Sequence, residues 1–206
     1  MGLRERKKHQ TRQALIDTAF DLFLIQGFEA TTVDQIAAAV EVSPRTFFRY
    51  FGSKEDLALD FTAEYDERIT AALAARPDDE APLAALVGAY REFTRAMEGK
   101  SDSAEDFERF VKHRRVIDAN PGLLAASFAR MSEVEEKLSE EIARRLGADP
   151  GDLRPRLLVA FVTSAVRVGF ACAVEGQGPR ALAADVERSL DLAEAVLTPG
   201  AGRLLV

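Results

Sequence analysis

The chain of 206 residues is long enough for one or two domains with a sizeable core, and 47% of its residues are hydrophobic, as in ordinary globular proteins. Its single cysteine excludes an internal disulfide framework, and its first ten residues lack the apolar segment of a secretory signal, so we expect a cytoplasmic protein. The net charge of −7 argues against a nucleic-acid partner only if the charge is spread evenly along the chain.

The basic residues are concentrated at the N-terminal end. Residues 1–54 contain eight Lys or Arg and six Asp or Glu, whereas residues 55–206 contain 19 and 28. Residues 4–12 alone hold five basic side chains and one acid. Because the local field decides where a polyanion binds, this distribution allows the N-terminal part to bind DNA.

The first predicted helix spans about residues 4–26. It ends before Gly27, because glycine is the preferred residue just past a helix C-terminus. Its apolar residues repeat with the spacing of one buried stripe, which consists of Ile16, Ala19, Phe20 and Phe23.

Two short helices around a tight turn are predicted next. The first begins at Thr32, with Gln35 at the spacing of a capping box. The second begins at Ser43 and Pro44, since serine at the N-cap and proline at the first helical position both favour a helix start. It carries Arg45 and almost no acid, as does a helix that lies in a groove of DNA.

The remaining helices are longer and are separated by Gly- and Pro-rich segments. No segment alternates between apolar and polar residues for long enough to predict a strand. The sequence therefore predicts an all-α protein of about nine helices. After the first three, helices are expected from Ser53 to about residue 75 and at about residues 82–98, 103–117, 122–146, 153–174 and 180–197.

A specific series of residues extends from residue 10 to residue 57. It consists of Thr11-Arg12, Ala19, Phe23, Gly27-Phe28, Thr31-Thr32, Ile36-Ala37, Val42-Ser43, Phe51 and Ser53-Lys54-Glu55-Asp56-Leu57. In order and spacing this series resembles the TetR family of bacterial repressors. The resemblance implies a homodimer with a three-helix helix-turn-helix DNA-binding domain at residues 1–54 and an effector-binding and dimerisation domain at residues 55–206. It also implies release from operator DNA when a small effector binds.

Two positions depart from the usual pattern of that family. Glycine usually precedes the second short helix, where Glu41 stands here, and a β-carbon strains a backbone with positive φ. Phe48 stands in place of a tyrosine whose hydroxyl would reach a phosphate. An alternative therefore stays open, namely a helical small-molecule-binding or interaction protein with weakened DNA binding.

The predicted DNA contacts follow from side-chain chemistry. Arg45 suits O6 and N7 of guanine, while Pro44 and Thr46 suit a thymine methyl or a nearby base edge. Basic and hydroxyl groups at helix ends suit phosphates, and the basic residues near the N-terminus suit an arm along the DNA backbone or minor groove. A solvated basic face is the plain alternative. The predicted set is Arg4, Lys7, Lys8, Thr32, Ser43, Pro44, Arg45, Thr46, Phe48, Arg49, Tyr50 and Lys54.

An effector site is predicted between the helix at residues 53–75 and the middle helices. Each aromatic residue there is better explained by core packing than by a pocket wall, but as a set they suggest an apolar effector. Arg167 lies in an apolar helix and needs a partner, which suggests an anionic end on that effector. The C-terminal half also resembles regulators related to the mycofactocin regulator, which implies an acyl-CoA-like molecule or a carboxylate. The predicted set is Phe61, Tyr65, Phe93, Phe107, Phe110, Phe128, Met131, Phe161 and Arg167.

Residues 157–174 form a nearly apolar stretch that is borderline for a membrane span. Arg167 within it and amphipathic neighbouring helices favour a buried helix at a subunit interface instead. Small residues such as Gly169 would allow close approach, and the last helix would complete a four-helix interface. Packing within one chain is the alternative.

No motif predicts an enzyme, a metal site or a cofactor. The sequence has no Gly-rich phosphate loop, no His-Glu-x-x-His and no Gly-x-Ser-x-Gly. His9 and His113 lie far apart beside basic residues, so we expect structural or surface roles for both. Cys172 is expected as a small core residue.

Overall fold

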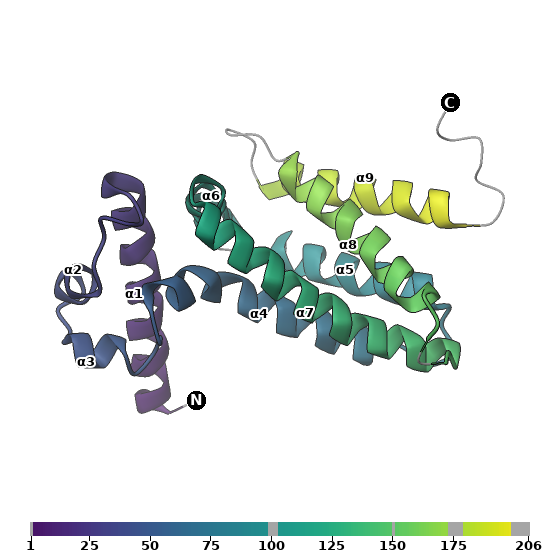
Figure 1. The fold of residues 1–206 in the computed structure, drawn as a ribbon, viewed down its shortest axis with the longest axis horizontal. Helices are drawn as coiled ribbons and strands as arrows, with labels where there is room; N and C mark the ends of the chain where they lie inside the picture. The colour runs from purple at the N-terminus through teal and green to yellow at the C-terminus, as the bar shows by residue number, and fades with distance from the viewer. Residues whose placement is uncertain (1, 99–102, 150, 173–178, 199–206) are drawn as a thin grey trace. The chain divides into compact units, whose positions relative to one another are not determined.

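The structure, a computed structural model, describes residues 2–98, 103–149, 151–172 and 179–198 (Figure 1). Within these ranges the chain forms nine α-helices and no strand, which confirms the predicted all-α class. The helix bounds lie within a few residues of the predicted ones. The helices are α1 (Leu3–Gln26), α2 (Val33–Ala39), α3 (Pro44–Phe47), α4 (Lys54–Ala74), α5 (Pro82–Glu98), α6 (Ser103–Ala119), α7 (Pro121–Leu146), α8 (Arg154–Ala171) and α9 (Pro179–Leu197).

The starts of α2 and α3 are fixed by side-chain caps. The Thr32 hydroxyl accepts a hydrogen bond from the Gln35 amide at 3.2 Å, and the Gln35 side chain accepts one from the Thr32 amide at 2.9 Å. The Ser43 hydroxyl accepts from the Thr46 amide at 3.1 Å. These bonds satisfy amide groups that a helix start leaves without backbone partners, and so both starts are predictable from sequence.

The helices divide into two compact units. The first contains Met1–Glu64 and Glu108–Ala129, and the second contains Tyr65–Phe107 and Arg130–Val206. Helices α4, α6 and α7 therefore each contribute to both units. The domain boundary after residue 54 stays a prediction, and no sequence pattern indicated that residues 108–129 pack with the N-terminal helices.

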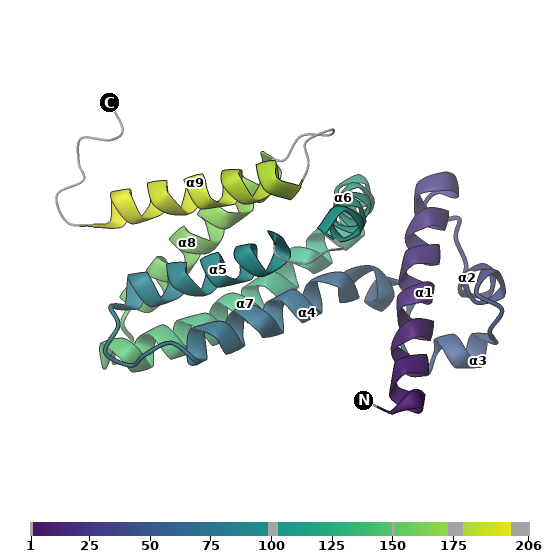
Figure 2. The same cartoon turned by 180° about the vertical axis from the view of Figure 1, so that it is seen from behind.

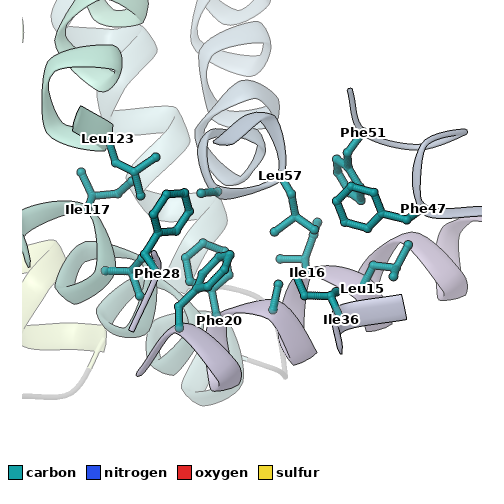
Figure 3. Packing of buried hydrophobic residues seen from close by; sticks show 14 of the residues in the cluster. Leu15, Ile16, Phe20, Phe28, Ile36, Phe47, Phe51, Leu57, Ile117 and Leu123 are labelled. Carbon is teal, nitrogen blue, oxygen red and sulfur yellow. The ribbon is translucent and has the colours of Figure 1, made fainter. Parts of the chain in front are cut away.

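A single hydrophobic cluster holds the first unit together (Figure 3). Helix α1 supplies Leu15 and Phe20, while Ile117 and Leu123 come from α6 and α7. Phe47 of α3 is fully buried in the same cluster. The short helix α3 is therefore anchored by its inner side, which leaves its opposite side to solvent.

In the second unit, α8 packs closely against α9 and both contact α5 (Figure 2). Gly169 permits this approach, because a β-carbon there would lie 2.6 Å from the Cα of Val186. Arg91 of α5 adds a link to α9, with its Nε 3.0 Å from Oε2 of Glu187. The close approach that Gly169 permits is thus made to α9 within the chain, and the predicted four-helix subunit interface stays a prediction.

The apolar stretch at residues 157–174 supplies most of α8, which is buried on one side only. Val162 is buried, whereas Leu157 and Phe161 are each 54% exposed. None of the helices in the described part of the chain combines the length and the hydropathy that a membrane span requires. Cys172, just after α8, is exposed, so its predicted place in the core is wrong.

Candidate nucleic-acid interface

The turn between α2 and α3 is closed by two backbone hydrogen bonds. The Glu41 amide donates to the Ala38 carbonyl at 3.1 Å, and the Val42 amide donates to the Ala37 carbonyl at 2.9 Å. This pair of bonds is a Schellman motif, which ends a helix with one residue in the left-handed region. That residue is Glu41, with φ of 55°, and the positive φ expected at this position is confirmed.

Helix α3 has a buried side and an exposed side. The Phe48 amide donates to the Pro44 carbonyl at 3.0 Å, so helical geometry continues past Phe47. Pro44, Arg45, Phe48 and Arg49 are all exposed. Residues four apart on a helix are neighbours, so these four side chains share one side. We call them the outer face of α3, and in a helix-turn-helix this is the face that meets the major groove.

Several polar side chains on and near the outer face interact with neighbouring side chains. The hydroxyl oxygens of Ser43 and Thr46 lie 2.9 Å apart. The Arg49 guanidinium lies over the Tyr50 ring, 5.2 Å from its centroid, which limits the directions in which this cation points. The DNA contacts predicted for these four residues stay predictions, and Ser43 also has a structural role as the cap of α3.

Lys54, at the start of α4, holds the turn before α2 in place, a role that no sequence pattern indicated. Its Nζ donates to the Phe28 carbonyl at 2.9 Å, and the carbonyls of Glu29 and Thr31 each lie 3.4 Å away. The ammonium also lies 4.4 Å from the centroid of the Phe28 ring. The Lys54 side chain is only 17% exposed. A phosphate would therefore have to compete with the three carbonyl groups for its ammonium group.

The other predicted phosphate contacts are exposed. Thr32 is exposed while its hydroxyl caps α2. Arg4, Lys7 and Lys8 are exposed on the first turns of α1. They lie on a helix, as predicted, because the chain is helical from Leu3 onward, and their contacts along the DNA backbone or minor groove stay a prediction.

Helix α6 is tied to α1 by two ion pairs inside the first unit. Arg109 makes two contacts with Asp17, from Nε to Oδ1 at 3.0 Å and from Nη2 to Oδ2 at 3.3 Å. Lys112 Nζ lies 2.7 Å from Oδ1 of Asp21. All four side chains are partly exposed, so the pairs contribute orientation more than stability.

His113 ties α6 to α4 in the same unit. Its Nε2 lies 3.0 Å from the Ala58 carbonyl oxygen, and since a carbonyl only accepts, Nε2 carries the proton and donates it. The ring also packs against Phe20 of α1, with centroids 5.4 Å apart. Burial lowers the pKa of His113 to about 4, so the imidazole is neutral at neutral pH. The expectation of a structural role is confirmed.

The residues predicted to bind an effector fall into different units. Phe110 and Phe128 belong to the first unit, whereas Phe93, Phe107, Met131, Phe161 and Arg167 belong to the second. Phe93 is buried, and Phe107, Phe110 and Met131 are partly buried. The side chains of Phe61 and Tyr65 lie outside the described residues.

Three members of this predicted set are on the surface. Arg167 is exposed on α8, so its charge is solvated and the argument that it needs an internal anionic partner is wrong. Phe161 and Phe128 are 54% and 46% exposed, so core packing within the chain does not explain them, and their role in effector binding stays a prediction. The apolar character of α8 does not reveal which of its sides is packed, and this caused the error at Arg167.

The second unit contains a buried pair of hydroxyl groups and a partly exposed ion pair that no motif indicated. The Tyr90 hydroxyl of α5 lies 3.5 Å from Thr163 Oγ1 of α8, and burial raises the pKa of Tyr90 to about 12. Asp66 of α4 pairs with Arg130 of α7 at 3.3 Å. Burial raises the pKa of Asp66, although Arg130 opposes this shift.

The chain resembles known proteins along most of its length. Residues 15–61 match the family described as "Bacterial regulatory proteins, tetR family", and residues 80–198 match the "MftR C-terminal domain". The HTH-type transcriptional regulator TcmR of Streptomyces glaucescens is 46% identical over 169 residues, which cover 81% of this chain and 74% of TcmR. The putative mycofactocin biosynthesis transcriptional regulator MftR of Mycobacterium tuberculosis is 29% identical, with 73% of each chain covered.

The fold is also that of solved regulators. The structure of a SmeT–triclosan complex has a TM-score of 0.64 and 18% identity, and the match covers 93% of this chain and 94% of that one. SmeT is the repressor of the Stenotrophomonas maltophilia multidrug efflux pump SmeDEF. At this identity the likeness concerns the fold alone. Together with the two family matches, the capped α2–turn–α3 segment and its exposed outer face show that the chain is a DNA-binding transcriptional regulator of the TetR family.

Proposed function

We propose that two copies of the chain bind an operator through the outer face of α3 and leave it when a small effector binds the second unit. The observation that carries the proposal is the construction of α3. On the inner side of α3, Phe47 is fully buried, while Arg45 and Arg49 are exposed on its outer face. A short helix held rigidly from behind can present side chains to base edges with little loss of conformational entropy on binding.

The two arginines have different tasks in this proposal. Arg45 is exposed at the start of α3 and reads guanine through its two-pronged guanidinium. Arg49 is stacked on Tyr50 and contacts a phosphate, which sets the position of the helix without reading sequence. Because the DNA is in the cytoplasm of a bacterium, we place the protein there.

The effector is proposed to be largely apolar, with an acyl-CoA-like or carboxylate character. The likeness of residues 80–198 to the MftR C-terminal domain supports a ligand-binding role for the second unit. We assign the polar end of the effector to the partly buried Arg130 and the buried Tyr90, in place of the exposed Arg167. An effector releases DNA only if it binds the DNA-free arrangement more tightly than the DNA-bound one.

We propose that effector binding in the second unit is coupled to the DNA-binding helices through α6, which contributes to both units. A change at its beginning would be carried to α1 through Arg109 and Lys112 and to α4 through His113. This would change the spacing of the two recognition helices from the ~34 Å that successive turns of the major groove require. Palmitoyl-CoA and palmitate are suitable first probes, with operator affinity as the readout.

The test of DNA reading is an affinity measurement on a duplex that the full-length protein selects from a random pool. We expect Arg45→Ala to weaken binding to this duplex by about 1–3 kcal/mol and to relax the preference at one base pair. Arg180→Ala is the matched control, because Arg180 is an exposed arginine on α9. Equal losses on selected and random duplexes would make Arg45 a phosphate contact, and a pool without enrichment would overturn the proposal.

A second candidate function is ligand or protein binding with weakened DNA binding. It is favoured by Glu41, an acid beside the outer face with φ of 55°, and by Phe48, which has no hydroxyl for a phosphate. If this candidate is correct, the wild-type protein enriches no sequence. The double variant Glu41→Gly, Phe48→Tyr would then regain specific binding.

A further inference from the structure

The outer face of α3 consists of two parallel stripes with different chemistry. Arg45 and Arg49 form a cationic stripe, and Pro44 and Phe48 form an apolar stripe. In each stripe the two residues are four positions apart and therefore adjacent on the helix surface. Phe48 is 55% exposed, although it is a large apolar side chain in the part of the chain that meets DNA.

The Phe48 ring is held in a defined orientation. It meets the buried Phe47 ring edge-on, with centroids 5.5 Å apart and an angle of 83° between the ring planes. Edge-to-face packing of this kind is favourable and restricts the ring. The ring is thus an apolar group presented beside Arg45 at a fixed place on α3.

Phenylalanine can recognise few features of a DNA duplex. It cannot donate a hydrogen bond to a phosphate or to a base edge. The major groove offers one strongly apolar group, the C5-methyl of thymine, which apolar side chains contact directly. Covering the exposed ring with such a methyl removes apolar surface of both partners from water.

We infer that Phe48, flanked by Pro44, reads a thymine methyl group and is a specificity-determining residue of this regulator. This inference rests on the proposed function, because it requires that the outer face of α3 meets the major groove. It adds to that function that part of the sequence preference comes from an apolar contact, between the Phe48 ring and a thymine methyl. The preferred thymine lies beside the base pair that Arg45 reads, since the two stripes are adjacent.

The experiment removes the methyl groups one at a time. In the duplex selected by wild-type protein, each thymine is replaced by deoxyuridine, which differs only in lacking the C5-methyl. We expect one substitution to weaken wild-type binding by about fourfold, the effect of burying one methyl-sized group. The same substitution should leave the affinity of Phe48→Ala unchanged, because that variant has lost the partner of the methyl.

Arg45→Ala is the matched control, and it should still lose about fourfold on the same deoxyuridine duplex. Phe48 is exposed, so Phe48→Ala should keep the thermal stability of wild type, and a melting curve verifies this. If no deoxyuridine substitution weakens wild-type binding, or if Phe48→Ala responds as wild type does, the inference is overturned while the proposed function stands. Failure to select any duplex would overturn both.

Discussion

Glu41 occupies a backbone position that glycine fills at a second helix end of the same chain. At the end of α7, Gly147 has φ of 56°, its amide lies 3.2 Å from the Arg144 carbonyl, and the Ala148 amide lies 3.0 Å from the Ala143 carbonyl. The turn after α2 repeats this hydrogen-bond pattern with Glu41 in the glycine position. A residue with a β-carbon pays about 1–2 kcal/mol for left-handed geometry, so Glu41 stores strain beside the DNA-reading helix.

We expect Glu41→Gly to raise the free energy of unfolding by about 0.5–1 kcal/mol. The relief of strain is partly offset by the greater freedom of glycine in the unfolded chain. Chemical denaturation measures the difference. Glu41→Ala is the control that removes the charge but keeps the β-carbon, and Gly147→Ala should be destabilising at the equivalent position. If Glu41→Ala stabilised as much as Glu41→Gly, charge rather than backbone strain would be the cause.

Helix bounds are predictable here because their causes are local. The caps at Thr32 and Ser43 act within three residues, and both are predictable from local sequence, the first from capping-box spacing and the second from serine followed by proline. The packing of residues 108–129 with the N-terminal helices was not predictable, because it depends on contacts between residues far apart in sequence. Which side of α8 is exposed was not predictable either, since the helix carries apolar residues on all of its sides. The errors at Arg167 and Cys172 have this origin.

His113, which links α6 to α4, makes the free energy of unfolding depend on pH. Its pKa is about 4 in the folded protein, against an ordinary value of 6.5. Above pH 6.5 both the folded and the unfolded chain have a neutral imidazole, and its contribution to stability is complete. As the pH falls from 6.5 towards 4, only the unfolded chain takes up the proton, so stability is lost.

We therefore expect the free energy of unfolding to decrease over this range by up to ~1.4 kcal/mol per pH unit through His113. His113→Gln keeps a donor for the Ala58 carbonyl but does not titrate, and it should show a shallower dependence. Urea denaturation of both proteins between pH 4 and 7 gives the comparison, in which carboxylate titration is common to both. Parallel curves would contradict the assignment.

At the scale of the whole molecule, the second unit exposes an apolar surface suited to a second copy. On α8 it includes Leu157, Phe161 and Val168, and on α9 it includes Leu192 and Val196. Their spacing places them along one side of each helix. Exposed apolar residues gathered on two adjacent helices mark interaction surfaces, and dimerisation of TetR-family regulators supplies the second copy.

We expect Phe161→Glu to convert a dimer into a monomer. The substitution would bury an unpaired carboxylate at the interface and raise the dimer dissociation constant by about 100-fold or more. Sedimentation equilibrium gives the mass. Ile25→Glu is the control, because Ile25 is an 81% exposed apolar residue of α1 in the other unit. A wild-type monomer at micromolar concentration, or a dimeric Phe161→Glu, would contradict this interface.

A dimer of this chain should also bind DNA as a unit with two reading helices. The operator is then a pair of half-sites whose centres are one helical turn apart, about 34 Å. A monomeric Phe161→Glu would hold one half-site only and lose most of the affinity for the full operator.

The central claim is that the outer face of α3 recognises a specific DNA sequence. The measurement that tests it most directly is a titration of the full-length protein against the DNA preceding its own gene and against a random duplex, at two salt concentrations. We predict binding to the first at least ~100-fold tighter, with a steep loss of affinity at higher salt. Equal affinity for both duplexes, together with no sequence enriched from a random pool, would contradict it.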